Sequence, residues 1–291
     1  MALIVAVHGI GQQFSGDAIL QEKWWSALLS GVHLVGHNLT DKSQLVCPFY
    51  GHLFRPPGAL ALCPVYCADD IQPEDEEAEL LALFWRAAAK AEPNKVPSPE
   101  SYAAGTSLVG TPQIVQCALK ALLGSSFFEN ISESVLIGDL KQVVRYLNQP
   151  GLRESVLTIV QSQIISDTRV VIGHSLGSVV AYEALCRNPK NVVSFVSIGS
   201  PLGIRNLIFD KLTPHPNTSG IGAWPGPVKY WTNIADKGDI VALEKKLAPF
   251  FSKRVKDILV CNGSDAHDAT RYLTTKEAGE AIAAGIWDAN S

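Results

Sequence analysis

The sequence predicts an α/β fold with a mostly parallel central sheet and helices on both faces. Residues 2–7 form a continuous apolar run, which is typical of a strand buried on both faces of a parallel sheet. The β-branched run 170–172 passes through a glycine-rich turn into the helix-compatible stretch 178–185. Strand, turn and helix therefore follow one another within a single short segment, as α/β folds require.

Further elements follow along the chain in a compatible order. We expect helices at 17–34, 74–91, 114–123, 139–147 and 152–165, and strands at 44–50, 228–234 and 255–260. The helix at 74–91 begins with acidic residues and has Lys90 near its end, which complements the helix dipole. The last two helices return the chain to the sheet before residue 170, which leaves room for a right-handed crossover between parallel strands.

The chain length fits a single α/β domain over residues 1–291 that contains one sizeable insertion. Residues 68–137 have no counterpart in a simple alternation of strand and helix. One interpretation is a helical cap whose apolar inner surface receives an acyl chain or another apolar group. The other is that these helices only extend the core.

Charge and hydropathy exclude several classes of partner. The formal net charge is −4, and the sequence contains no basic stripe with interleaved aromatic residues, so we expect no nucleic-acid partner. The N-terminal run lacks the basic residues of a signal peptide, and no apolar run reaches the roughly 18 residues of a membrane span. We therefore expect a cytoplasmic protein without an integral membrane segment.

The cysteines predict neither a disulfide framework nor a metal site. None of them forms a C-x-x-C pair, and most lie among apolar neighbours, so we expect reduced, buried thiols. The six are Cys47, Cys63, Cys67, Cys117, Cys186 and Cys261.

The strongest functional signal is the pentapeptide Gly-His-Ser-Leu-Gly at 173–177. A G-x-S-x-G turn between a strand and a helix holds its serine in a strained conformation, which requires small neighbours. The turn would raise the Ser175 hydroxyl beside the first amides of the helix, where a developing negative charge is stabilised. The motif therefore predicts a nucleophile, although a glycine-rich turn with an incidental serine is the alternative.

A serine nucleophile needs a base, and in enzymes with this turn an acid and then a histidine follow the serine in the chain. Only His215 and His267 follow Ser175. His215 lies between two prolines in an irregular loop, whereas His267 follows the strand-like run 255–260 and a turn. We predict His267 as the base; a solvated loop histidine is the alternative.

Two carboxylates compete for the role of the acid. Asp236 and Asp239 both follow the strand expected at 228–234, and Asp239 is followed by an apolar pair that can anchor it at a buried edge. We prefer Asp239 and interpret Asp236 as a turn-forming residue. Weaker candidates, which follow no convincing strand in the required order, are Glu183, Asp210 and Asp268.

The loop after the first strand predicts an oxyanion hole. Acyl transfer needs donors fixed where the carbonyl oxygen becomes negative, and backbone amides meet this need. In the sequence His8-Gly9-Ile10-Gly11, the N–H of Ile10 is one such donor, and the N–H of Leu176 is the other. A dinucleotide-binding loop fits poorly, because Phe14 occupies the position of the third glycine.

Together these segments resemble the α/β-hydrolase superfamily and, within it, the lipase-like esterases. The resemblance rests on 8–11, 173–177, the strand end at 198–202, 233–241 and His267, and it spans nearly the whole chain. The triplet Asp239-Ile240-Val241 is similar to the acid loop of many lipases. In the family fold the oxyanion loop follows the third strand, so the resemblance implies a minimal sheet without the first two strands.

We therefore predict a serine hydrolase that cleaves carboxylic esters through an acyl-enzyme, with Ser175, Asp239 and His267 as catalytic residues and His8, Gly9, Ile10 and Leu176 forming the oxyanion side. The chemistry implies no metal and no organic cofactor, and the expected substrate is a small or lipid-like ester. An acyltransferase or a thioesterase would use the same residues, and a binding module could keep the fold without activity. The sequence leaves acyl and alcohol specificity and the oligomeric state open.

Overall fold

The computed structural model describes residues 2–55, 65–103, 112–129 and 131–287. The chain divides into two compact units: one comprises Met1–Leu53 together with Gln149–Ser291, and the other comprises Phe54–Asn148. We call them the sheet unit and the helical unit. The segment 68–137, expected as an insertion, falls within the helical unit.

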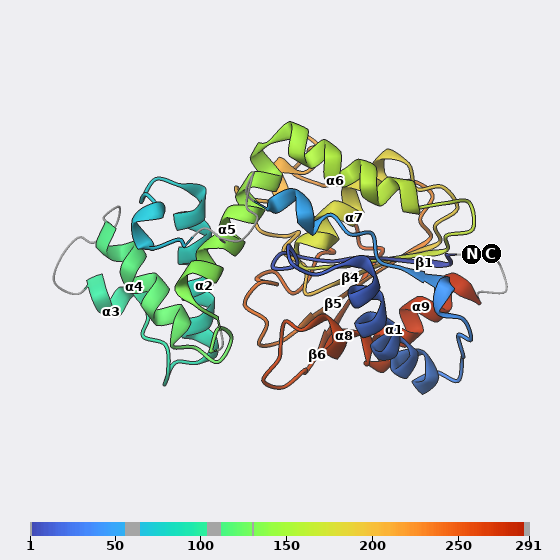
Figure 1. The fold of residues 1–291 in the computed structure, drawn as a ribbon, viewed down its shortest axis with the longest axis horizontal. Coiled ribbons are helices and arrows are strands. Elements are labelled where there is room, and N and C mark those ends of the chain that lie inside the picture. Colours follow the sequence, from blue (N-terminus) through green and yellow to red (C-terminus); the bar gives the residue numbers. More distant parts are fainter. Residues whose placement is uncertain (1, 56–64, 104–111, 130, 288–291) are drawn as a thin grey trace. The chain divides into compact units, whose positions relative to one another are not determined.

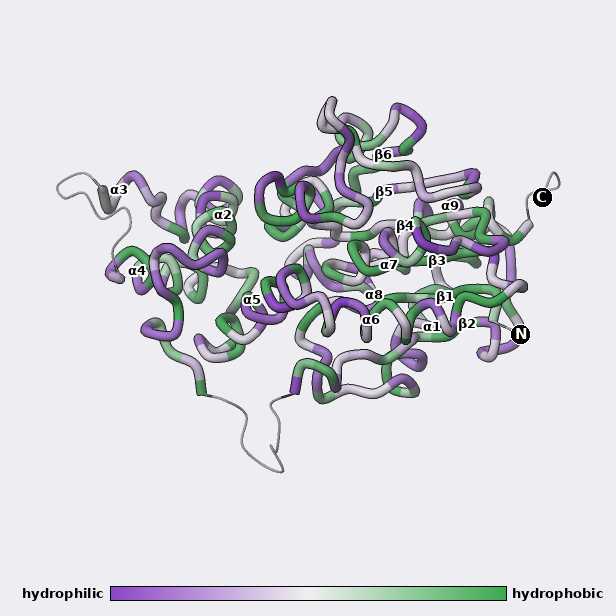
Figure 2. Tube along the Cα trace, turned by 90° about the horizontal axis from the view of Figure 1, so that it is seen from above, coloured by the Kyte–Doolittle hydropathy of each residue, from purple (hydrophilic) through white to green (hydrophobic). Residues whose placement is uncertain are grey.

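The sheet unit is built on one open sheet of six parallel strands, in the order β2-β1-β3-β4-β5-β6. All four residues of β1 are buried, as expected for a strand covered on both faces, and β1 is hydrophobic along its length (Figure 2). The predicted α/β class with a parallel central sheet is confirmed. The strands are β1 (Ile4–Val7), β2 (Leu45–Val46), β3 (Val170–His174), β4 (Ser194–Ile198), β5 (Tyr230–Asp236) and β6 (Val255–Val260).

Helices cover both faces of this sheet (Figure 1). On one face lie α1 (Asp17–Leu34), α8 (Ala269–Leu273) and α9 (Lys276–Ile286), and on the other lie α6 (Pro150–Gln163) and α7 (Leu176–Arg187). Helix α1 begins and ends at the predicted residues. The short α8 and the helix α9 were not predicted; both begin at a capping side chain, Asp268 and Thr275 respectively.

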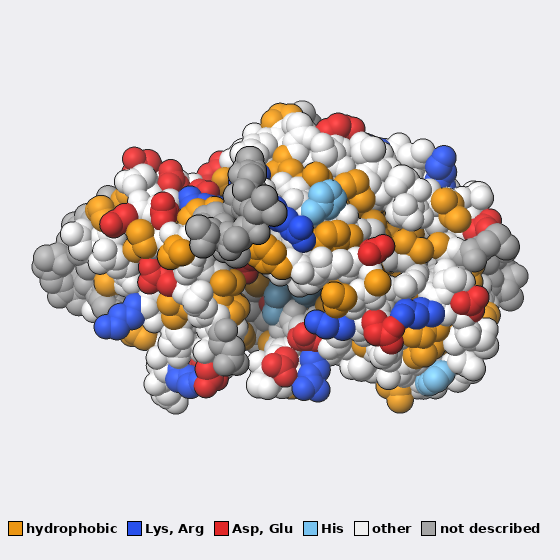
Figure 3. Space-filling view, in the orientation of Figure 1, with side chains coloured by type: hydrophobic (Ala, Val, Ile, Leu, Met, Phe, Trp, Pro, Cys, Tyr) orange, Lys and Arg blue, Asp and Glu red, His pale blue; other side chains and the backbone are white. Residues whose placement is uncertain are grey.

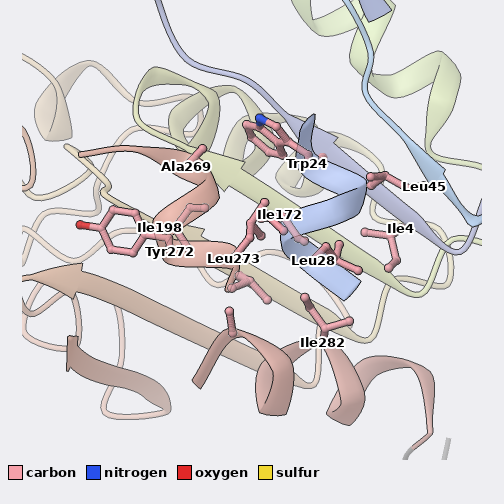
Figure 4. Close-up of a cluster of buried hydrophobic side chains, with 14 of the residues drawn as sticks. Ile4, Trp24, Leu28, Leu45, Ile172, Ile198, Ala269, Tyr272, Leu273 and Ile282 are labelled. Carbon is pink, nitrogen blue, oxygen red and sulfur yellow. The ribbon is translucent and has the colours of Figure 1, made fainter. Parts of the chain in front are cut away.

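The main hydrophobic core of the sheet unit lies between the sheet and α1, α8 and α9 (Figure 4). Leu28 of α1, Ile172 of β3 and Ile282 of α9 are each fully buried in it. Burying one such side chain contributes about 1.5–3 kcal/mol, so this layer fixes the C-terminal helices firmly against the strands. The loop that carries His267 directly precedes α8 and is positioned by this packing.

The helical unit has its own core. Its helices are α2 (Glu76–Ala91), α3 (Pro99–Ala103), α4 (Pro112–Leu123) and α5 (Glu133–Asn148). Helix α2 packs against α4 and α5, and most of the leucine, valine and aromatic residues of these helices are buried. Much of the apolar surface on these helices is therefore used within the unit itself.

The strand expected at 44–50 is much shorter than predicted. Strand β2 covers only Leu45–Val46, and the chain then leaves the sheet. Pro48 has no N–H to give to a neighbouring strand, so the apolar run does not continue the ladder.

The expectation that the cysteines are buried is correct only in part. Cys47 is buried, whereas Cys67 and Cys261 are exposed and Cys117 and Cys186 are partly buried; all five are free thiols. Cys63 lies outside the described residues. Cys67 and Cys261 show that a cysteine with apolar neighbours in the sequence need not be buried in the fold.

The direction of the strand order changes between β1 and β3. Strand β2 lies on one side of β1, while β3 and all later strands lie on the other side. The connections after β1 and β3 therefore diverge at the carboxyl ends of these two strands, which is where ligands bind in open α/β sheets. The loop from His8 and the turn at Ser175 both begin at this point.

None of the helices in the described ranges is long and apolar enough to cross a membrane.

On the face of the sheet unit seen in Figure 3, acidic and basic side chains are interspersed.

Candidate active site

Ser175 sits in a strained turn between β3 and α7. Its φ of 54° and ψ of −132° lie in a region that residues with a side chain rarely occupy. The turn is held from both sides: the Ser175 N–H donates to the carbonyl of Ile198 at 3.1 Å, and the Ser175 carbonyl accepts the N–H of Ser178 at 2.9 Å. The pentapeptide predicts such a strained backbone at the serine, and the structure has it at Ser175.

The two glycines of the pentapeptide allow the close packing of this turn. A Cβ on Gly173 would lie 2.5 Å from Cα of Ser178, and a Cβ on Gly177 would overlap the carbonyl oxygens of Val7 and His8. The start of α7 therefore lies directly against the ends of β1 and β3: a larger side chain at Gly177 would push it away from β1, and one at Gly173 would push it away from β3.

Asp239 and His267 form a hydrogen-bonded pair. The distance from Nδ1 of His267 to Oδ2 of Asp239 is 2.7 Å. An ionised carboxylate can only accept, so Nδ1 donates and Nε2 of the neutral ring carries a lone pair. The Asp239 side chain is completely buried, while that of His267 is 30% exposed. His267 can therefore take up a proton at Nε2.

Asp239 is held in its ionised form. Burial alone would raise its pKa, but the adjacent His267 and the hydrogen bonds from His267, Tyr272 and the N–H of Val241 outweigh this effect and lower the pKa to about 2. The N–H groups of Val241 and Ala242 donate to Oδ1 at 2.9 and 3.2 Å. Both carboxylate oxygens are thus occupied, which fixes the direction of the bond to His267.

Asp236, the competing carboxylate, has different partners. Its Oδ1 accepts the N–H of Gly238 at 2.6 Å, and its Oδ2 accepts the N–H of Asn262. These bonds close the turn after β5 and attach it to the segment after β6. Of the two aspartates, Asp239 is the one that contacts His267 in this structure.

The weaker carboxylate candidates also have structural partners. Glu183 is buried in an ion pair with Arg153, Asp210 accepts the N–H of Asn206 at 2.6 Å, and Asp268 caps the first turn of α8. His215, the competing base, is exposed.

The segment of Ile198 and Gly199 contacts both the serine turn and the Asp239–His267 pair. This glycine has a φ of +54° and directly follows Ile198, whose carbonyl binds the Ser175 N–H. A Cβ at Gly199 would lie 2.9 Å from Oδ2 of Asp239 and 3.1 Å from Nδ1 of His267. The end of β4 and the glycine that follows it therefore connect the serine turn with the acid–base pair.

His174 provides a second connection between the turn and the base. Its Nε2 lies 2.7 Å from the carbonyl oxygen of His267, so Nε2 carries the proton and donates it. The centroids of the two rings are 4.7 Å apart. Burial, with a further contribution from His267, lowers the pKa of His174 to about 3, which keeps this ring neutral. The residue before the serine thus attaches the loop of His267 to the serine turn.

The loop after β1 lies against the serine. A Cβ on Gly9 would be 2.7 Å from Cβ and 3.3 Å from Oγ of Ser175, so only glycine fits there without displacement. The Nδ1–H of His8 donates to the carbonyl of Gly9 at 2.8 Å. In a trans peptide the N–H points away from the carbonyl, so this bond also sets the direction of the Ile10 amide.

Leu176 is the first residue of α7, so its N–H has no partner within the helix. The two amides that the sequence predicts as oxyanion donors therefore belong to segments that directly contact Ser175. His8 itself is buried and stacks on Tyr50 with ring centroids 4.0 Å apart. Burial lowers its pKa to about 4, and its ring supports the loop from inside.

Sequence reasoning gave no role to Tyr272 or to the side chain of His174. Tyr272 donates to Oδ2 of Asp239 at 2.8 Å from helix α8, which the sequence analysis did not predict. His174 occupies the variable position of the pentapeptide, where the motif itself assigns no function. Neither contact has a signature in the spacing of residues along the chain.

No protein-family model matches this sequence, and a search of curated proteins finds no significant relative. The functional interpretation therefore depends on the geometry of the site.

Proposed function

We propose that this protein is a serine hydrolase that cleaves carboxylic esters through an acyl-enzyme intermediate. The observation that supports this most strongly is the pair of Asp239 and His267, in which Nδ1 carries the proton, linked through His174 to a serine in a strained strand-to-helix turn. Nucleophile, base and orienting acid are the three groups that this chemistry requires.

In the proposed acylation, Nε2 of His267 takes the hydroxyl proton as Oγ of Ser175 attacks the ester carbonyl. The Ile10 and Leu176 amides stabilise the negative oxygen. The carbon–oxygen bond to the alcohol then breaks, and the imidazolium gives its proton to the departing alcohol. This leaves an ester between Ser175 and the acyl group.

Deacylation repeats these steps with water. His267 removes a proton from water, the resulting hydroxide attacks the acyl carbonyl, and Ser175 Oγ leaves and regains the proton from His267. Throughout both steps Asp239 remains ionised and holds the ring, in keeping with its low pKa.

Turnover of p-nitrophenyl esters from acetate to long-chain acyl groups tests this proposal. We expect hydrolysis by the wild type, and a loss of roughly 10⁴-fold or more in Ser175→Ala. Ser162→Ala, which removes an exposed serine of α6, is the matched control and should keep full activity. A folded wild type that hydrolyses none of these esters and never reacts with a fluorophosphonate would instead indicate a binding module. Equal activity in Ser175→Ala would exclude this serine as the nucleophile.

A further inference from the structure

Tyr272 lies in the hydrophobic core but directs its hydroxyl out of it. The residue is completely buried, and its ring belongs to the cluster beneath the sheet. In Figure 4 the ring lies beside Ile198, and its oxygen points away from the labelled apolar side chains. A phenol in such a place needs partners, because an unpaired buried hydroxyl is destabilising.

The partners of this hydroxyl are both at the active site. It accepts the N–H of Asp236 at 2.8 Å and donates to Oδ2 of Asp239 at 2.8 Å. Oδ2 is also the oxygen that accepts Nδ1–H of His267. One carboxylate oxygen is therefore shared between a tyrosine and the base, and the tyrosine is itself bound to the last residue of β5.

We propose that Tyr272 is a positioning residue that sets both the orientation and the basicity of His267 through Asp239. This inference rests on the proposed function. The bond from Tyr272 withdraws electron density from Oδ2, so the carboxylate stabilises the imidazolium less than it would alone. It also prevents the carboxylate from rotating, which keeps the ring of His267 in one orientation.

Other ionisable groups around His267 belong to several elements. His174 remains neutral, and Asp268 caps α8 with its carboxylate. The groups that face His267 and its partner are Asp239, Tyr272, His174, Asp268, Asp236 and Lys245, the last of which donates to the backbone carbonyl of Asp239. Replacing Tyr272 alone leaves all the others in place, so a change in the pH profile can be assigned to the shared oxygen.

Tyr272→Phe is the first test. It keeps the ring in the core and removes only the hydroxyl. We expect kcat for a p-nitrophenyl ester to fall roughly tenfold with little change in KM, because one hydrogen bond to a charged group is lost. The acidic limb of the kcat/KM profile should move up by about half a pH unit, because the carboxylate now stabilises the imidazolium more strongly.

Tyr182→Phe is the matched control. Tyr182 is equally buried, and its hydroxyl donates to the backbone carbonyl of Ala223 at 2.9 Å. It should lose stability as Tyr272→Phe does and leave the pH profile unchanged. If both variants alter the profile equally, or if Tyr272→Phe has the wild-type kcat and profile, Tyr272 has no such role.

A second substitution tests the same inference without removing the hydroxyl. With 3-fluorotyrosine in place of Tyr272 the phenol is more acidic and donates more strongly, so the acidic limb should move to lower pH, opposite to its shift in Tyr272→Phe. A shift in the same direction would overturn the inference. Failure of the proposed function is distinguishable, since the wild type would then show no ester turnover at all.

Discussion

The contact between Gly9 and Ser175 gives a quantitative test of the site. A Cβ at position 9 would lie 2.7 Å from Cβ of Ser175 and 3.2 Å from the carbonyl oxygen of His174, whereas ordinary contact begins at 3.4 Å. In Gly9→Ala the loop and the serine turn must therefore separate by about 0.7 Å. Both are backbone segments at the ends of buried strands, so neither can move freely.

This separation should affect rate more than folding. Overpacking of this kind costs about 1–3 kcal/mol of unfolding free energy. A displacement of roughly 1 Å in a reacting group can lower the rate by about 100-fold. We therefore expect Gly9→Ala to remain folded and to lose about two orders of magnitude in kcat/KM.

The assay is hydrolysis of a p-nitrophenyl ester, with urea unfolding to measure stability. Gly16→Ala is the control, because its backbone is extended and a Cβ there would meet no atom within 4 Å. It should behave as the wild type in both measurements. Wild-type kcat/KM in folded Gly9→Ala would refute the reasoning, since it would show that Gly9 does not set the position of the serine.

Two further predictions concern the acid and a buried histidine. Asp239→Asn should lower kcat by about 10⁴-fold, because the amide favours the wrong tautomer of His267. Asp236→Asn should keep kcat within about tenfold of the wild type and lose about 1–3 kcal/mol of unfolding free energy. Steady-state rates and urea unfolding measure both effects, and the reverse order of activities would contradict the assignment of Asp239 as the acid. Burial lowers the pKa of His8 from 6.5 to about 4 in the folded protein, so as pH falls His8 is protonated in the unfolded chain before it is protonated in the folded one. The stability due to His8 is thus complete above pH 6.5 and decreases toward pH 4. Unfolding free energy should drop by about 2 kcal/mol more between pH 7 and pH 5 in the wild type than in His8→Asn, and equal drops would show that His8 is not held neutral.

Strong local patterns made parts of the fold predictable from the sequence. Helix α1 has a clear start and end, and the run 255–260 is β6 as expected. Strand β3, the turn at Ser175 and helix α7 follow one another as the pentapeptide and its neighbours indicate. In these segments the apolar pattern and the turn residues favour the same structure.

Other features depend on contacts between distant segments. Asp236 and Asp239 are both buried beside the same strand end, and only the position of His267 distinguishes them. The short β2 and the role of Tyr272 are likewise decided by packing rather than by a local pattern. For the same reason, the sequence of the helices at 68–137 is compatible with either a cap or a core, and their packing on one another depends on contacts between α2, α4 and α5.

The central claim is that Ser175 forms a covalent bond with the substrate. Rapid acid quenching of the protein with a p-nitrophenyl ester, followed by peptide mass spectrometry, tests it most directly. We expect the mass of one acyl group, less the hydrogen it replaces, on the peptide that contains Ser175, and none at this position in Ser175→Ala. An acyl group that forms at the same rate on another residue, or turnover without any acylated Ser175, would contradict the claim.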